Sequence, residues 1–196
     1  MKRVCLIGPI DKRIVIYPMI KALMYSSKAL IITDDGSYRR ILPNYDSNGT
    51  IENVGIVVIP DEQLINEEYI LNKIGYTADD LDYIIYVTTN RIIDNSDKII
   101  YFKGSKNSIC SDELDEKLIE MEVEQVIIDL EVPNPKSNKQ LSLGTDEIQF
   151  IYTVEINKQF PNIKNKKLLG KLTVIISFIL DIAQNNVMSL INRTSK

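Results

Sequence analysis

Short, continuous apolar runs recur along the chain, and segments with helical spacing separate them. Runs without polar positions between the apolar ones are typical of strands in a parallel sheet that is covered on both faces. Glycine, proline or aspartate follows several of the runs, as turn-forming residues do after strands. The pattern predicts seven strands, the last at a sheet edge or in a hairpin: residues 3–7, 29–33, 54–59, 81–87, 98–102, 125–130 and 149–156.

Between these runs, apolar residues recur every three or four positions, as they do on one face of a helix. Pro18 fits best in the first turn of a helix, so we expect the regular part of the first helix to begin at Tyr17. Residues 43–50 are polar and contain a proline, which favours an irregular loop. Helices are predicted over residues 14–24, 66–74 and 111–121.

Alternation of strands with helices indicates an α/β fold with three layers, in which helices cover both faces of a mostly parallel sheet. The chain has 196 residues, which is the size of one domain, so we expect a single α/β domain over residues 1–196. Residues 157–196 form its C-terminal helical segment, which either packs on the domain or serves association.

The C-terminal segment is predicted to hold one long helix over residues 167–192, and its apolar residues are too many for a single stripe. We therefore expect self-association through this helix, with burial across its own sheet as the alternative. Contact with a membrane is less favoured because Asp181 interrupts the apolar sequence and the basic residues lie mainly before it.

Composition excludes several classes of function. The chain has no histidine and two cysteines, so it has no Ser-His-Asp triad, no histidine metal ligand and no zinc cluster of cysteines. A net charge of −4 argues against binding along a nucleic-acid backbone, and no nucleic-acid partner is expected. The sequence shows no secretory signal pattern and no uncharged apolar run of about 18 residues, so we expect a cytoplasmic protein.

The segment after the first predicted strand occupies the place of a phosphate-binding loop. Such a loop needs glycines, whose N–H groups point to phosphate oxygens, together with a lysine and a magnesium-binding serine or threonine. Only Gly8 and Lys12 have this chemistry. Pro9 lacks an N–H group, Asp11 adds negative charge, and Arg13 stands where serine or threonine is required. By themselves these residues fit a tight turn with solvated charges.

The order and spacing of several segments resemble the MinD/ParA family of P-loop ATPases. In that family the P-loop lysine lies about 22 residues before an aspartate that ends the next strand, which is the spacing from Lys12 to Asp34. Residues 81–89 are similar to the family strand Tyr-Asp-Tyr-Ile-Ile-Ile-Asp-Thr-Pro, and residues 96–100 are similar to Ala-Asp-x-Ile-Ile. The resemblance covers about residues 3–130.

The resemblance implies a P-loop NTPase-like fold in which Gly8, Lys12 and Asp34 would contact a nucleotide, if one binds. It also implies that Lys12 and Asp34 lie close together at the carboxyl edge of neighbouring parallel strands. However, Arg13 replaces the family's magnesium-binding residue, and Val87 replaces its metal-handling aspartate. We therefore expect no catalytic residue, no metal ligand and no cofactor, with ATP and magnesium as the less favoured case.

These departures favour a degenerate relative of the family, similar to CpaE-like proteins. Such a pseudo-ATPase would be a non-catalytic scaffold or regulator that binds other proteins in a larger assembly, and secretion, pilus or conjugation machinery are analogies only. Two alternatives stay open. One is a nucleotide-binding switch ATPase with an atypical phosphate loop, and the other is an enzyme of another class on an α/β fold.

Overall fold

The computed structural model describes residues 1–42, 44, 46–60, 66–103, 112–121, 123–127 and 166–192. Within these residues the strands form one sheet in the order β3-β4-β2-β5-β1-β6-β7. Every pair of neighbouring strands is parallel except β3 and β4. The strands are β1 (Lys2–Ile7), β2 (Ala29–Thr33), β3 (Asn48–Ile51), β4 (Val54–Val58), β5 (Tyr83–Thr88), β6 (Lys98–Lys103) and β7 (Glu124–Ile127).

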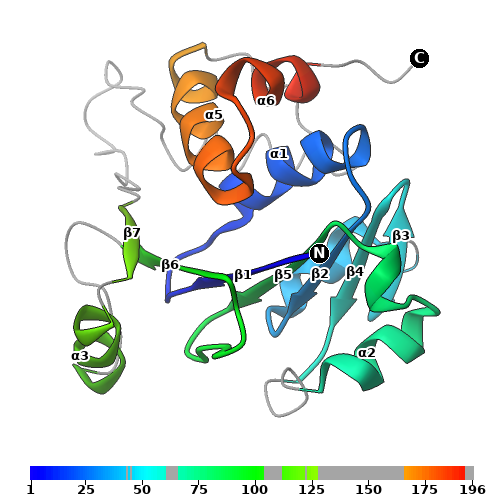
Figure 1. The fold of residues 1–196 in the computed structure, drawn as a ribbon, viewed down its shortest axis with the longest axis horizontal. Helices are drawn as coiled ribbons and strands as arrows, with labels where there is room; N and C mark the ends of the chain where they lie inside the picture. Colours follow the sequence, from blue (N-terminus) through cyan, green and yellow to red (C-terminus); the bar gives the residue numbers. More distant parts are fainter. Residues whose placement is uncertain are drawn as a thin grey trace, which may run out of the picture.

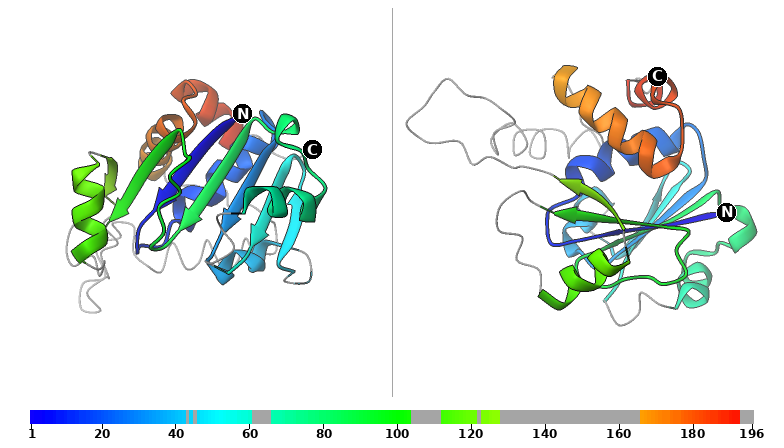
Figure 2. Two further views of the ribbon diagram at one scale, coloured as in Figure 1. Left: turned by 60° about the horizontal axis from the view of Figure 1, so that its bottom comes forward. Right: turned by 60° about the vertical axis from the view of Figure 1, so that its left-hand side comes forward.

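Helices cover both faces of this sheet, as Figures 1 and 2 show. One face carries α1 (Arg13–Met24), α5 (Lys166–Leu180) and α6 (Gln184–Ile191), and the other carries α2 (Glu67–Ile74) and α3 (Asp112–Glu120). Two short 3₁₀ helices complete the described elements, η1 (Gly36–Ile41) and η4 (Ala78–Asp80). The expected three-layer α/β fold with a mostly parallel sheet is confirmed.

Side chains of β1 alternate between the two layers, which explains why its apolar run is continuous. Val4 and Leu6 join the core on the α1 side, whereas Cys5 and Ile7 join the core on the α2 side. All four side chains are fully buried. A central strand of a covered parallel sheet has this pattern because neither of its faces reaches water.

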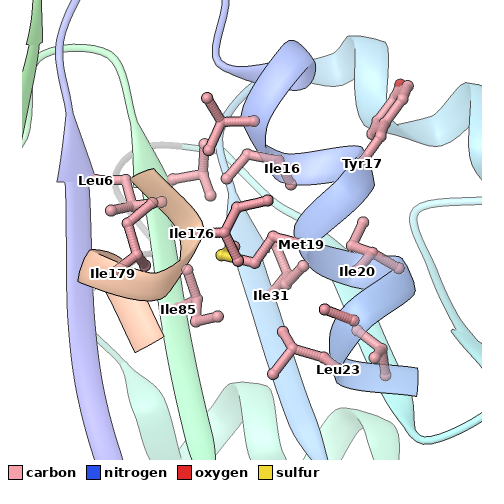
Figure 3. Packing of buried hydrophobic residues seen from close by; sticks show 14 of the residues in the cluster. Leu6, Ile16, Tyr17, Met19, Ile20, Leu23, Ile31, Ile85, Ile176 and Ile179 are labelled. Carbon is pink, nitrogen blue, oxygen red and sulfur yellow. The ribbon is translucent and has the colours of Figure 1, made fainter. Parts of the chain in front are cut away.

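The core on the α1 side joins the central strands of the sheet to α1, α5 and α6. In Figure 3, Ile176 and Ile179 of α5 lie over Leu6 of β1 and Ile85 of β5, beside Met19 of α1. Because α1 packs on the sheet and also contacts α5 and α6, nearly its whole length is buried. This burial also explains why α1 begins at Arg13 and contains Pro18, rather than beginning at Tyr17 as predicted. Tertiary packing stabilises the turn that proline weakens.

The first part of the sheet differs from the prediction at one edge. Residues 48–51, which were expected in a loop, form β3 and pair with β4 in antiparallel register. The hairpin turns at Glu52, which has a φ of 51°. β3 is an edge strand, and a strand at the edge of a sheet can be polar because one of its sides faces water. It therefore lacks the apolar run by which the other strands were predicted.

The prediction of one long C-terminal helix is wrong. The segment forms α5 and α6, which are bent by 116° relative to each other. Asp181 ends α5 with a φ of 52°, a left-handed conformation that a continuing helix cannot hold. In the described part of the chain no single helix has the length and apolar character to cross a membrane, although α5 and α6 together would pass by length and composition. The strand predicted over residues 149–156 lies outside the described residues.

Candidate functional site

A pocket of about 240 Å³ lies at the carboxyl ends of β1, β5 and β2. Ligands of open α/β sheets bind at this edge, because the loops after the strands converge there. The pocket is lined by residues 9–13 after β1, residues 34, 35, 37 and 38 after β2, and residues 87–89 at the end of β5. Lys12 and Asp34 therefore line the same pocket.

The strands that carry these two residues are not neighbours. β1 and β2 are parallel to β5, which lies between them, so the expectation that they pair directly is wrong. The crossover through α1 carries the chain past one strand position. Lys12 and Asp34 nevertheless line one pocket together with residues 87–89 at the end of β5, and the charge of Asp34 acts on the Lys12 ammonium.

Gly8 is required by backbone packing at the base of the loop. Its φ is 138°, and its N–H group donates to the carbonyl oxygen of Thr88 at 3.2 Å. A Cβ atom at this position would overlap the carbonyl oxygen of Phe102 in β6. Only glycine allows the chain to leave β1 this close to a neighbouring strand.

Lys12 is folded back into the loop. Its side chain is buried, and Nζ donates to the carbonyl oxygens of Gly8 at 2.5 Å and of Ile10 at 3.4 Å. Burial lowers the pKa of Lys12 to about 8, although the nearby carboxylates, Asp34 first among them, oppose the shift. The ammonium group is therefore held by main-chain oxygens of its own loop.

Asp11 and Arg13 form a closed pair at the start of α1. Oδ1 of Asp11 accepts hydrogen bonds from the main-chain N–H group and from Nε of Arg13, both at 2.9 Å. Oδ2 accepts from Nη2 at 2.6 Å and from Nε at 3.0 Å. Sequence reasoning treated Asp11 only as an unfavourable charge. Aspartate also accepts hydrogen bonds from the main chain two residues on, which is a common turn contact, and that preference points to this contact.

The other two loops hold their carboxylates by main-chain N–H groups. Oδ2 of Asp34 accepts from the N–H group of Thr89 at 3.2 Å, which links the ends of β2 and β5. Oδ1 of Asp35 accepts from the N–H group of Ser37 at 2.8 Å and caps η1. Thr88 is buried and donates through Oγ1 to the carbonyl oxygen of Arg91 at 2.6 Å.

The charges that line this pocket are unfavourable for the phosphates of a magnesium nucleotide. Three carboxylates and two cations face it, so the lining has a net charge of −1 before any phosphate is added. Arg13 is paired with Asp11, and the side chain of Val87 offers no oxygen ligand. Among the described residues no group of three or more aspartates, glutamates or cysteines could hold a metal ion.

Comparison with known proteins gives no match to a family model and no match to a curated protein sequence. Among solved structures, the chain is similar to a chain of the MinC:MinD cell division protein complex of Aquifex aeolicus. The two share 11% identity with a TM-score of 0.50, over 100% of this chain and 98% of the other.

Two further structures are also similar to the chain. MinD of Aquifex aeolicus has 12% identity and a TM-score of 0.46, over 98% of this chain and 87% of the other. A plasmid partition protein from Borrelia burgdorferi has 13% identity and a TM-score of 0.46, over 93% of this chain and 99% of the other. Together with the strand order and the pocket, the first similarity shows that this chain has the fold of the MinD/ParA-type P-loop ATPases.

Proposed function

We propose that this chain is a non-catalytic protein with the MinD/ParA fold, a pseudo-ATPase that acts as a scaffold or regulator by binding other proteins. The observation that carries the proposal is the pair of residues at the positions where the resemblance places magnesium chemistry, Arg13 and Val87. Phosphoryl transfer depends on a metal that neutralises phosphate charge and fixes geometry. Neither side chain offers an oxygen ligand, so the pocket lacks both groups that would hold it.

The charge of the loop supports the same conclusion. A triphosphate would have to approach Asp11, Asp34 and Asp35 without the compensation of a metal. The two cations of the loop are already bound, Lys12 by carbonyl oxygens and Arg13 by a carboxylate. Displacing those contacts costs free energy that a nucleotide would have to supply.

Calorimetric titration with ATP and with GTP, each with and without magnesium, tests the proposal. We expect no heat of binding at millimolar nucleotide and no phosphate release above the rate of buffer alone. Lys12→Ala is the matched control. Magnesium-dependent phosphate release that falls in Lys12→Ala would contradict the proposal and favour the switch ATPase.

Protein binding is expected at the C-terminal helices, most simply as self-association. The MinC:MinD complex is a case in which a protein of this fold is found with a protein partner. Most apolar side chains of α5 pack inside this chain, including Leu169, Ile176 and Leu180. Val174 and Met188 are 49% and 40% exposed, and they are the most exposed large apolar side chains in the described parts of α5 and α6.

Light scattering over a range of protein concentrations tests self-association. We expect the intact chain to form a dimer or larger species and Val174→Glu to shift it toward the monomer. Met121→Glu is the control, because Met121 is 42% exposed but lies after α3 on the other side of the sheet. A monomer at every concentration, or equal effects of the two substitutions, would contradict this proposal.

A second candidate function rests on Lys12. A buried lysine with a pKa of about 8 in a pocket is a property of enzymes that use a neutral lysine amine. Treatment with an aldehyde and borohydride at pH 8, followed by peptide mass spectrometry, tests it. Faster labelling of Lys12 than of exposed lysines such as Lys73 would favour an enzyme of another class. Because Nζ is held by Gly8, we expect slower labelling.

A further inference from the structure

The carboxylate of Asp11 lies at the place where the first turn of α1 would hold an external anion. The first N–H groups of a helix have no partner within the helix and carry the positive end of its dipole, so they attract anions. Arg13 is the first residue of α1, and its N–H group donates to Oδ1 of Asp11 at 2.9 Å. The anion at this helix terminus therefore belongs to the chain itself.

The guanidinium group of Arg13 strengthens the same contact. It donates to both carboxylate oxygens of Asp11, at distances from 2.6 to 3.0 Å. Planar guanidinium groups bind carboxylate and phosphate with the same two-pronged geometry, so one anion excludes the other. The side chains of Arg13 and Asp11 are 21% and 33% exposed, which leaves them partly shielded from water.

The remaining cation of the loop is also turned inward. Lys12 is 6% exposed, and its Nζ reaches the carbonyl oxygens of Gly8 and Ile10. The Nζ of Lys12 and the N–H group and guanidinium of Arg13, which a phosphate could use, are therefore bound by groups within six residues of the same chain. An intramolecular partner acts at a high effective concentration, which a free ligand must exceed to displace it.

We propose that Asp11 is a built-in substitute for a phosphate group, which closes the start of α1 against external anions. Removal of its carboxylate frees the N–H group and the guanidinium of Arg13 to bind inorganic phosphate. This inference rests on the proposed function, because it gives the loss of nucleotide binding a cause in one side chain.

The test compares Asp11→Asn and Asp11→Gly with the unchanged chain, with inorganic phosphate as the probe. Asparagine keeps the size of the side chain, and its Oδ1 can still accept from the main-chain N–H group of Arg13. Its NH₂ group repels the guanidinium, so this variant frees the guanidinium alone, whereas glycine frees both donors. Asp35→Asn is the matched control: Asp35 lines the same pocket, the change removes the same charge, and an asparagine oxygen can still cap η1. Unfolding midpoints are measured in phosphate and in chloride at equal ionic strength.

We expect both Asp11 variants to have a higher unfolding midpoint in phosphate than in chloride. The unchanged chain and Asp35→Asn should have the same midpoint in both salts. When the phosphate concentration is about ten times the dissociation constant, mass action predicts that the unfolding midpoint rises by about 3–6 °C. Titration calorimetry of Asp11→Asn with phosphate should show saturable binding that disappears when Arg13→Gln is added. Equal shifts in Asp11→Asn and Asp35→Asn would mean that charge alone is responsible, which overturns the proposal.

The result separates this inference from the proposed function. Folded Asp11 variants that show no phosphate binding overturn the role of Asp11, while the unchanged chain still fails to bind nucleotide as a pseudo-ATPase should. Nucleotide binding by the unchanged chain overturns the proposed function and the closed loop together. If Asp11→Gly does not fold, Asp11→Asn decides the question, because it preserves the volume and backbone preference of the position.

Discussion

Nζ of Lys12 donates a hydrogen bond of 2.5 Å to the carbonyl oxygen of Gly8, four residues earlier in the chain. The contact joins the start of α1 to the end of β1 and closes the loop between them. It also buries a charged group, and burial of a charge has consequences that depend on pH.

The stability of the chain should rise between pH 8 and pH 10.5 through Lys12. Its pKa falls from 10.5 to about 8 on folding, because burial disfavours the charged form. Over this range the unfolded chain binds more protons than the folded chain, so deprotonation favours folding. The shift corresponds to about 3 kcal/mol of unfolding free energy. Below pH 8 the folded chain is destabilised by this amount, and above pH 10.5 the destabilisation is absent.

Urea unfolding of the unchanged chain and of Lys12→Met at several pH values measures this. The difference between their unfolding free energies should change by about 3 kcal/mol in favour of the unchanged chain from pH 7 to pH 10.5. Titratable groups that do not interact with Lys12 cancel in the comparison. Parallel curves would show that Lys12 does not titrate in this range.

Gly8→Ala should be strongly destabilising. The substitution combines a φ of 138° with an overlap between Cβ and the main chain of Phe102, so we expect a loss of about 3 kcal/mol or more. Two other glycines separate the effect of the positive φ from the effect of the overlap. Gly75 has a φ of 70° with open space around it, so Gly75→Ala should cost about 1–2 kcal/mol. Gly36 has open space and no positive φ, so Gly36→Ala should change stability by under about 0.5 kcal/mol.

Unfolding in urea compares the three variants. A cost for Gly8→Ala no larger than that for Gly75→Ala would show that β6 moves away from the loop and that the close approach is soft. In that case the loop geometry would not depend on glycine at this position.

Arg3 and Glu67 should be strongly coupled, because their pair ties α2 to β1. Nε and Nη2 of Arg3 donate to the carboxylate of Glu67 at 2.9 and 2.8 Å, and the hydroxyl of Tyr86 donates to it at 2.7 Å. A double-mutant cycle of Arg3→Met and Glu67→Gln should give about 1–2 kcal/mol of coupling. The exposed pair of Lys28 and Asp80, separated by 3.7 Å, is the control and should show little or none.

The same pair predicts a loss of stability in acid. The hydrogen bond from Arg3, and then that from Tyr86, lower the pKa of Glu67 below its ordinary value of 4.5. The carboxylate therefore stabilises the fold above pH 4.5, and this contribution disappears as the pH falls through the lowered pKa. Glu67→Gln should lack this part of the acid transition, and an unchanged transition would contradict the assignment.

The bend between α5 and α6 should depend on backbone conformation more than on charge. Asp181 forms ion pairs with Lys2 and Lys98, but its side chain is 56% exposed, so each pair contributes little. Asp181→Asn should therefore cost under about 1 kcal/mol, because asparagine tolerates a positive φ. Asp181→Val should cost about 1–2 kcal/mol more, because a branched side chain does not tolerate it. Equal losses in thermal unfolding would assign the bend to the ion pairs instead.

The interior strands and helices were predictable from the sequence because their burial leaves a local signal. β2, β4, β5 and the last four residues of β1 are apolar at nearly every position, since each has a covered layer on both faces. The order of strands and helices along the chain placed the loop of Gly8 and Lys12 and the turn of Asp34 at the same edge of the sheet, and the family resemblance linked Lys12 to Asp34. These features depend on which side chains avoid water, and the order of residues records that directly.

The order of the strands, the edge strand β3 and the bend at Asp181 were decided by tertiary structure. The crossover through α1 passes over one strand position, and β5, which comes later in the chain, occupies that position between β1 and β2. No pattern within a single segment predicts this order. α5 ends where Leu180 meets the hydroxyl of Tyr83, 97 residues earlier in the chain. Contacts between distant segments select among conformations that local preferences leave nearly equal in free energy. For that reason the sequence determined the layers and the loop, and only the folded chain determined how they meet.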